Sequence, residues 1–386
     1  MALYSAIESH VVTRRSDFSS APDDPAKRGA ITEMRTLLTS ARKLQSVMAW
    51  IDAISEPPLD LGTTYFVELA ARRLVGSNAE LLAISAEEAS YSTYRNPYEK
   101  VIADWGDPTE IAGDTVIVLF LPRREQRSGL LHPLLVHELG HAVCQTHDLT
   151  SRAYSQAIKR KRLQSRFATT AAAHALAEGL LPQEAALQIV NRMQGWLEEA
   201  LCDAIATQYL GPTYLYSFVA EVAAGNVDRA GKKHPPPRQR IRMILDHLGW
   251  ASTMKAAANG LDDWVRAISG EHPAYSGVEA FLVWTLDTVA KEVRRRVASL
   301  VQPHTFSPDS GELDEIKELL AAGIPPAQRQ SGETINSCAV ILGSWLFALE
   351  AAGGDVSSIP VAADSEELAK LLPKGLEMTA LMSAWN

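Results

Sequence analysis

The chain has 386 residues, of which 46% are apolar and 22% charged, and its formal net charge is −9. This composition is ordinary for a soluble globular protein, and the excess of acids argues against nucleic acid as the main partner. No apolar run approaches the roughly 20 residues that a membrane-spanning helix needs, and the first thirty residues do not resemble a signal peptide. The three widely spaced cysteines make no disulfide framework, so we expect a cytoplasmic protein.

The N-terminal part of the chain, residues 1–110, reads as a mainly helical region. Apolar residues recur at three- and four-residue steps over 31–56, and Pro57-Pro58 ends that helix. Two further helices are expected over 63–75 and 78–90, separated by Gly76.

The middle region, residues 111–250, begins with a strand over 115–121, which is rich in β-branched and aromatic residues. A helix follows with Pro133 in its first turn, where proline is tolerated. Helices are also expected over 152–178, over 183–210, where Gly195 is a possible break, and over 238–248. The third region, residues 251–386, is again mostly helical. We therefore predict a mainly α fold with one small sheet, an α+β protein of three regions.

The strongest chemical signal is the run His137-Glu138-Leu139-Gly140-His141. Residues four apart lie on one face of a helix, so both imidazoles can bind one ion, and zinc suits neutral imidazole. Glu138 can then face a water molecule on that ion and take its proton. The alternative is a pair of histidines without a metal on an ordinary helix.

A catalytic zinc needs a third protein ligand, and a later helix offers Glu199 and Asp203 on one face. Glu199 is the candidate ligand, and Asp203 can hold the far ring nitrogen of a ligand histidine. Glu198 is a weaker candidate because it lacks an aspartate four residues later. Two solvated acids are the alternative, but carboxylates among so many apolar residues would be costly without partners.

A rigid proline turn after His234 presents this histidine beside several cations. A histidine or arginine held by such a turn can stabilise the oxyanion that develops during hydrolysis. The alternative is a solvent-exposed loop that leads into a basic helix.

Together these segments resemble the gluzincin metallopeptidases, and within them the family of HtpX and the CAAX prenyl proteases. The resemblance covers residues 112–250 and implies a zincin-like core with one Zn²⁺. It implies that His137, His141 and Glu199 bind the metal, that Glu138 is the general base, and that Asp203 supports a ligand. The segment from His234 to Arg240 resembles the family's signature in which the histidine lies near the substrate carbonyl and the arginine orders the site.

The relatives in that family are integral membrane proteins, whereas this sequence shows no membrane-spanning segment, so a membrane substrate is not carried over. The resemblance implies that an extended peptide binds along an edge strand, for which 115–121 is the candidate. We therefore expect a zinc peptidase acting on a peptide or protein, with a possible partner on the flanking helices. Two rivals stay open: a non-catalytic interaction protein, and a zinc hydrolase of a non-peptide amide or ester.

Overall fold

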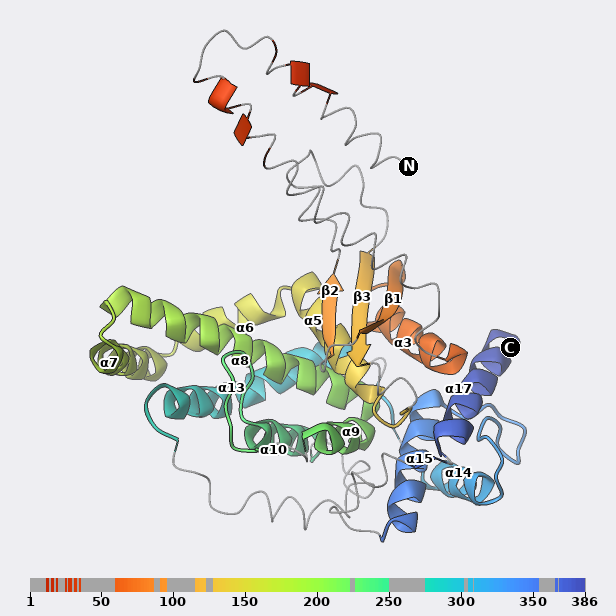
Figure 1. Cartoon of the computed structure of the whole chain (residues 1–386). Coiled ribbons are helices and arrows are strands. Elements are labelled where there is room, and N and C mark those ends of the chain that lie inside the picture. Colours follow the sequence, from red (N-terminus) through yellow and green to blue (C-terminus); the bar gives the residue numbers. More distant parts are fainter. Residues whose placement is uncertain are drawn as a thin grey trace.

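The structure is a computed structural model. It describes residues 60–86, 91–95, 115–122, 128–222, 226–249, 275–301, 305–307, 309–353, 365–366 and 368–385, with scattered positions between 12 and 35. The helix expected over 31–56 lies outside the residues that can be described as an element. The described part is mainly helical with one small sheet, which confirms the coarse prediction (Figure 1).

The sheet has three strands in the order β1-β3-β2. Strands β1 (Ala79–Ala86) and β3 (Thr115–Pro122) are parallel, and β2 (Ser92–Arg95) is antiparallel to β3. The central strand β3 is apolar on both faces: Ile117 and Leu119 are buried, and so is Val118 on the opposite face. This continuous run is typical of a strand covered on both sides.

Two sequence predictions about this sheet are wrong. Residues 79–86 form β1 rather than a helix over 78–90. Short apolar runs do not distinguish strand from buried helix, and here parallel pairing with β3 decides the outcome. The second error concerns the edge: β3 lies between the other two strands, so within the described sheet the edge beside the histidine helix is β2.

The histidine-bearing helix α5 (Pro133–Thr146) crosses the long helix α8 (Pro182–Leu210) in the middle of the fold. Pro133 is the first residue of α5, as the sequence predicts. Leu135, Leu139 and Val143 are fully buried on the side of α5 that faces the core. Helix α8 runs through Gly195 without a break and ends at Leu210. These two helices position the candidate site.

The remaining helices surround this pair. The basic and alanine-rich segment forms two helices, α6 (Leu149–Ile158) and α7 (Lys161–Glu178), and α9 (Pro212–Val222) and α10 (Pro237–Leu248) follow α8. Helix α13 (Gly277–Val301) packs along α8. At one end of the molecule, helix α3 (Leu61–Leu74) packs against α17 (Leu368–Trp385), which packs against α15 (Ser337–Ala351), and α14 (Ser310–Ala321) packs against α15 (Figure 1). In the part of the chain described, no helix has the length and apolar character needed to cross a bilayer.

Candidate metal centre

The site lies at a close approach of α5 and α8. A side chain at Gly140 would place its Cβ only 2.9 Å from the Cα of Cys202 on α8. Glycine at this position therefore allows the two backbones to come together. The close approach places the histidine face of α5 opposite the carboxylates of α8.

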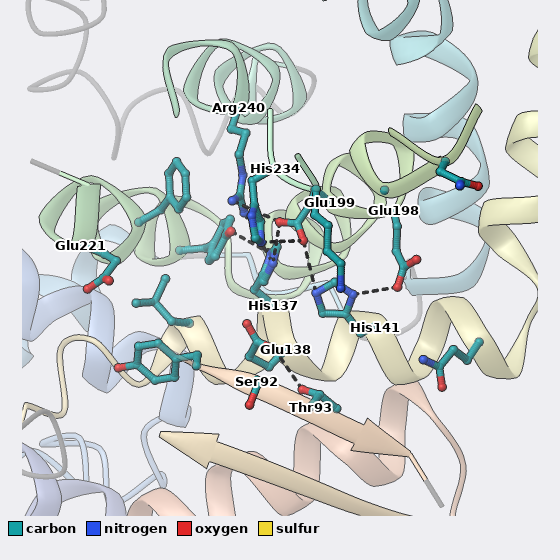
Figure 2. A pocket seen from close by; sticks show the side chains of 18 residues that line it. Ser92, Thr93, His137, Glu138, His141, Glu198, Glu199, Glu221, His234 and Arg240 are labelled. Carbon is teal, nitrogen blue, oxygen red and sulfur yellow. Dashed lines mark hydrogen bonds and ion pairs between the residues drawn. The ribbon is translucent and has the colours of Figure 1, made fainter. Parts of the chain in front are cut away.

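His137, Glu138 and His141 each bring one ligand atom within 4.8 Å of the others, so this group could hold a metal ion. The carboxylate of Glu199 lies opposite the two histidines: Oε2 is 3.4 Å from His137 Nε2, and Oε1 is 3.6 Å from His141 Nε2. Figure 2 shows these side chains converging on the cleft. Bonds of about 2.0–2.2 Å in a tetrahedral zinc site place neighbouring ligand atoms roughly 3.3–3.6 Å apart. Both separations to Glu199 lie in this range, each to a different oxygen of the carboxylate.

A buried oxygen of Glu199 that accepts no hydrogen bond in the described part of the chain is a second feature that suits a bound cation. Glu199 is 5% exposed, and its Oε2 accepts no hydrogen bond from the described residues, although Arg240 Nη1 lies 3.1 Å away. A buried acceptor in this state is costly unless something else satisfies it. A metal ion on the histidine side of the carboxylate would do so.

The other nitrogen of each imidazole has its own carboxylate partner. His137 Nδ1 lies 3.0 Å from Asp203 Oδ1, and His141 Nδ1 lies 2.8 Å from Glu198 Oε1. Both carboxylates come from α8, the helix that also carries Glu199. A carboxylate at Nδ1 favours the tautomer with its proton there, which leaves the Nε2 lone pair available to a metal.

Besides His137, two groups in the interior hold Asp203. Arg240 donates to both of its oxygens, with Nη2 2.6 Å from Oδ1 and Nε 2.8 Å from Oδ2, and the hydroxyl of Tyr214 donates to Oδ1. Asp203 and Tyr214 are both buried. Burial alone would raise the pKa of Asp203, but the Arg240 guanidinium outweighs it and holds this pKa well below its usual range. Asp203 therefore stays ionised.

The same charges act on His137 and Glu199. Burial lowers the pKa of His137, but the hydrogen bond with Asp203 and the close contact with the Glu199 carboxylate outweigh it and raise this pKa to about 10. Burial raises the pKa of Glu199, but the charge of Arg240 and the contact with His137 lower it to about 2. Two cations thus balance two buried anions. Because a ligand histidine must be neutral, a metal ion would take the place of the His137 proton.

Glu138 lies on the cleft side of α5, where Thr93 Oγ1 on the edge strand β2 donates to its Oε2 over 3.2 Å. The cleft has a volume of about 600 Å³, and both Glu138 and Thr93 line it. Glu138 thus belongs to the group that could hold a metal, and the cleft leaves room for a substrate beside it.

His234 lies at the rim of the same cleft, with its side chain 61% exposed and its Nε2 3.5 Å from Glu199 Oε1. Its loop rests directly on α8, because a Cβ at Gly195 would come within 3.3 Å of the carbonyl oxygen of Lys233. Trp196 on α8 also donates from Nε1 to the carbonyl oxygen of Gly231, over 3.4 Å. Helix α8 therefore anchors the loop, and the loop presents His234 to the cleft.

The structure brings together all seven residues singled out from the sequence, namely His137, Glu138, His141, Glu199, Asp203, His234 and Arg240. Sequence reasoning missed the contacts of Glu198 and Tyr214. The adjacent acids at 198 and 199 were visible, but only the crossing of α5 and α8 shows that consecutive glutamates face the two nitrogens of one imidazole. Tyr216, in contrast, stacks on Trp345 in the core.

Comparison of the chain with models of protein families, with curated proteins and with solved structures gives no significant match in any of the three. The resemblance to the gluzincins therefore rests on the sequence motifs alone.

Proposed function

We propose that the chain is a zinc-dependent peptidase in which His137, His141 and Glu199 hold one Zn²⁺. The observation that carries this proposal is the spacing of these residues: the Nε2 atoms of the two histidines lie 3.4 and 3.6 Å from the Glu199 carboxylate, while each Nδ1 has a carboxylate of its own. Two histidines and one glutamate are a common ligand set of catalytic zinc, which keeps the fourth position open.

Zinc in this place would polarise the scissile carbonyl and make a bound water more acidic. Glu138 is the base that takes the proton of the attacking water and passes it to the leaving amine. The hydrogen bond from Thr93 keeps the Glu138 carboxylate on the cleft side of α5. Thr93 therefore orients the base without touching the predicted metal ligands.

Arg240 has a positioning role, because its guanidinium is bound to Asp203 and to Glu199 inside the protein. His234 is the better candidate for the oxyanion, since it is exposed at the rim of the cleft and lies on an anchored loop. His234 and Arg240, which the family resemblance places in one signature, thus have different roles: His234 faces the oxyanion, and Arg240 positions the carboxylates.

The substrate is a peptide or protein segment in an extended conformation. Strand β2 lies at the edge of the described sheet beside α5, and its residues Ser92 and Thr93 line the cleft. A peptide can add to such an edge through main-chain hydrogen bonds. We assign this role to β2 in place of β3. A cytoplasmic location suits three cysteines that are all buried free thiols.

The test is Glu138→Gln, with Gln145→Ala, another change in the cleft lining, as its control. The zinc-loaded proteins are incubated with a mixed peptide library, and the products are identified by mass spectrometry. We expect Glu138→Gln to lose about 10²- to 10⁴-fold of the turnover while it retains zinc and fold. Equal turnover in wild type and Glu138→Gln would contradict the proposal. A zinc-bound wild type without any peptide product would favour the interaction protein or the non-peptide hydrolase.

A further inference from the structure

We infer that Glu198 is a positioning residue for the metal: its carboxylate holds the His141 ring so that Nε2 points at the ion. This inference rests on the proposed zinc site and adds a residue that the family resemblance does not supply. It concerns how tightly the protein retains the metal, so metal affinity can test it without any substrate.

The geometry assigns one glutamate to each nitrogen of the His141 ring. Glu198 Oε1 lies 2.8 Å from Nδ1, and Glu199 Oε1 lies 3.6 Å from Nε2 (Figure 2). An ionised carboxylate can only accept a hydrogen bond, so the contact with Glu198 requires a proton on Nδ1. In the neutral ring, Nε2 then carries the lone pair that a metal needs.

The two carboxylates that support the histidines differ in their surroundings. Asp203, behind His137, is bound by Arg240 and Tyr214 and is buried, so its charge is compensated. The Glu198 side chain is 31% exposed, and among the described residues no lysine or arginine pairs with it. The pair of Glu198 and His141 is therefore a charge-assisted hydrogen bond, and in the described part of the chain no lysine or arginine lies within ion-pair distance of Glu198 to compete with it.

This difference gives the two histidines different roles in the site. His137 is held by the buried network of Asp203, Arg240 and Tyr214, whereas His141 is partly exposed, with its side chain 21% accessible, and depends on Glu198 for its orientation. Without Glu198 the His141 ring could rotate about its side-chain torsions toward solvent. The structural cost would be small, because the Glu198 side chain lies partly at the surface. The loss would appear in metal affinity.

The experiment compares the zinc affinity of four full-length proteins by competition with a coloured chelator: wild type, Glu198→Ala, Glu198→Gln and Glu221→Ala. We expect Glu198→Ala to bind zinc about 10- to 100-fold more weakly, the range found when a carboxylate behind a ligand histidine is removed. Glutamine still offers an oxygen to Nδ1–H, so Glu198→Gln should stay within about fivefold of wild type. Glu221 also lines the cleft but lies apart from both histidines (Figure 2), so its loss should change the affinity less than about twofold.

Three results would overturn the inference. The first is wild-type affinity in Glu198→Ala. The second is a zinc affinity in Glu198→Gln that is as low as in Glu198→Ala. The third is a loss of zinc affinity in Glu221→Ala equal to that in Glu198→Ala. Either of these two results would mean that zinc affinity depends only on the total charge of the cleft. Circular dichroism of the zinc-free variants checks that they are folded. If wild type itself binds no zinc, the proposed function fails together with this inference; if wild type binds one zinc and only the Glu198 effect is absent, the proposed function is unaffected.

Discussion

The close crossing of α5 and α8 makes Gly140→Ala an informative perturbation. The new Cβ would lie 2.9 Å from the Cα and 3.0 Å from the Cβ of Cys202, whereas ordinary contacts begin near 3.4 Å. The two helices must therefore separate by about 0.5 Å, the difference between 3.4 and 2.9 Å. Alanine improves helix propensity by about 1 kcal/mol. Overpacking against a backbone costs about 1–3 kcal/mol, which exceeds the gain in propensity over most of that range.

We expect Gly140→Ala to lower the free energy of unfolding by about 1 kcal/mol and to weaken zinc binding at least tenfold. The metal effect follows because zinc–ligand distances tolerate only about 0.2 Å, and the separation of the helices widens the gap between Glu199 and the histidines beyond that. Urea unfolding of the zinc-free protein and chelator competition measure the two effects. Gly311→Ala, on α14 where no atom lies closer than 3.6 Å, is the control that gains stability. If Gly140→Ala were as stable as wild type and bound zinc equally well, the helices could not be as close as described.

Three further perturbations test other parts of the structure. Burial lowers the pKa of His247 from 6.5 to about 4, with a smaller contribution from the charge of Arg294. Below pH 6.5 the unfolded chain therefore binds more protons than the folded protein. The free energy of unfolding should then fall by about 3 kcal/mol as the pH drops from 6.5 to 4, and His247→Gln should remove this part of the pH dependence in urea titrations; an unchanged dependence would contradict it. Tyr214→Phe removes the hydrogen bond to ionised Asp203 and should lower the free energy of unfolding by about 2 kcal/mol in the same assay. An unchanged free energy of unfolding would mean that this hydrogen bond does not stabilise the protein. Gly195→Ala should push the loop beneath His234 by a few tenths of an ångström and lower kcat about three- to tenfold at unchanged zinc content, and unaltered kcat would speak against a role for this loop.

The local part of the site could be read from the sequence. Residues four apart on a helix share a face, so the pairing of His137 with His141, and of Glu199 with Asp203, required only the helical period. The start of α5 at Pro133 followed from the backbone chemistry of proline. These predictions depend on neighbours in the chain.

The parts that were wrong or missed depend on distant contacts. Residues 79–86 form a strand because they pair with β3, about 35 residues further along the chain. Strand β3 is central because β2 pairs with its other edge. The hydrogen bond between Glu198 and His141 depends on the crossing of two helices. Gly140 allows this crossing, but a glycine in the sequence does not predict it. Spacing alone predicts which residues share a face, and it does not predict which faces meet.

The most direct test of the zinc site is the metal content of the purified protein, measured by elemental mass spectrometry for wild type and for Glu199→Ala in parallel. We predict about one zinc per chain in wild type and a sharp loss in the variant, since Glu199 is the residue whose carboxylate lies 3.4 and 3.6 Å from the two imidazole nitrogens. A wild-type protein that takes up no zinc even when zinc is added back would contradict the metal site. So would a Glu199→Ala variant that retains zinc as tightly as wild type.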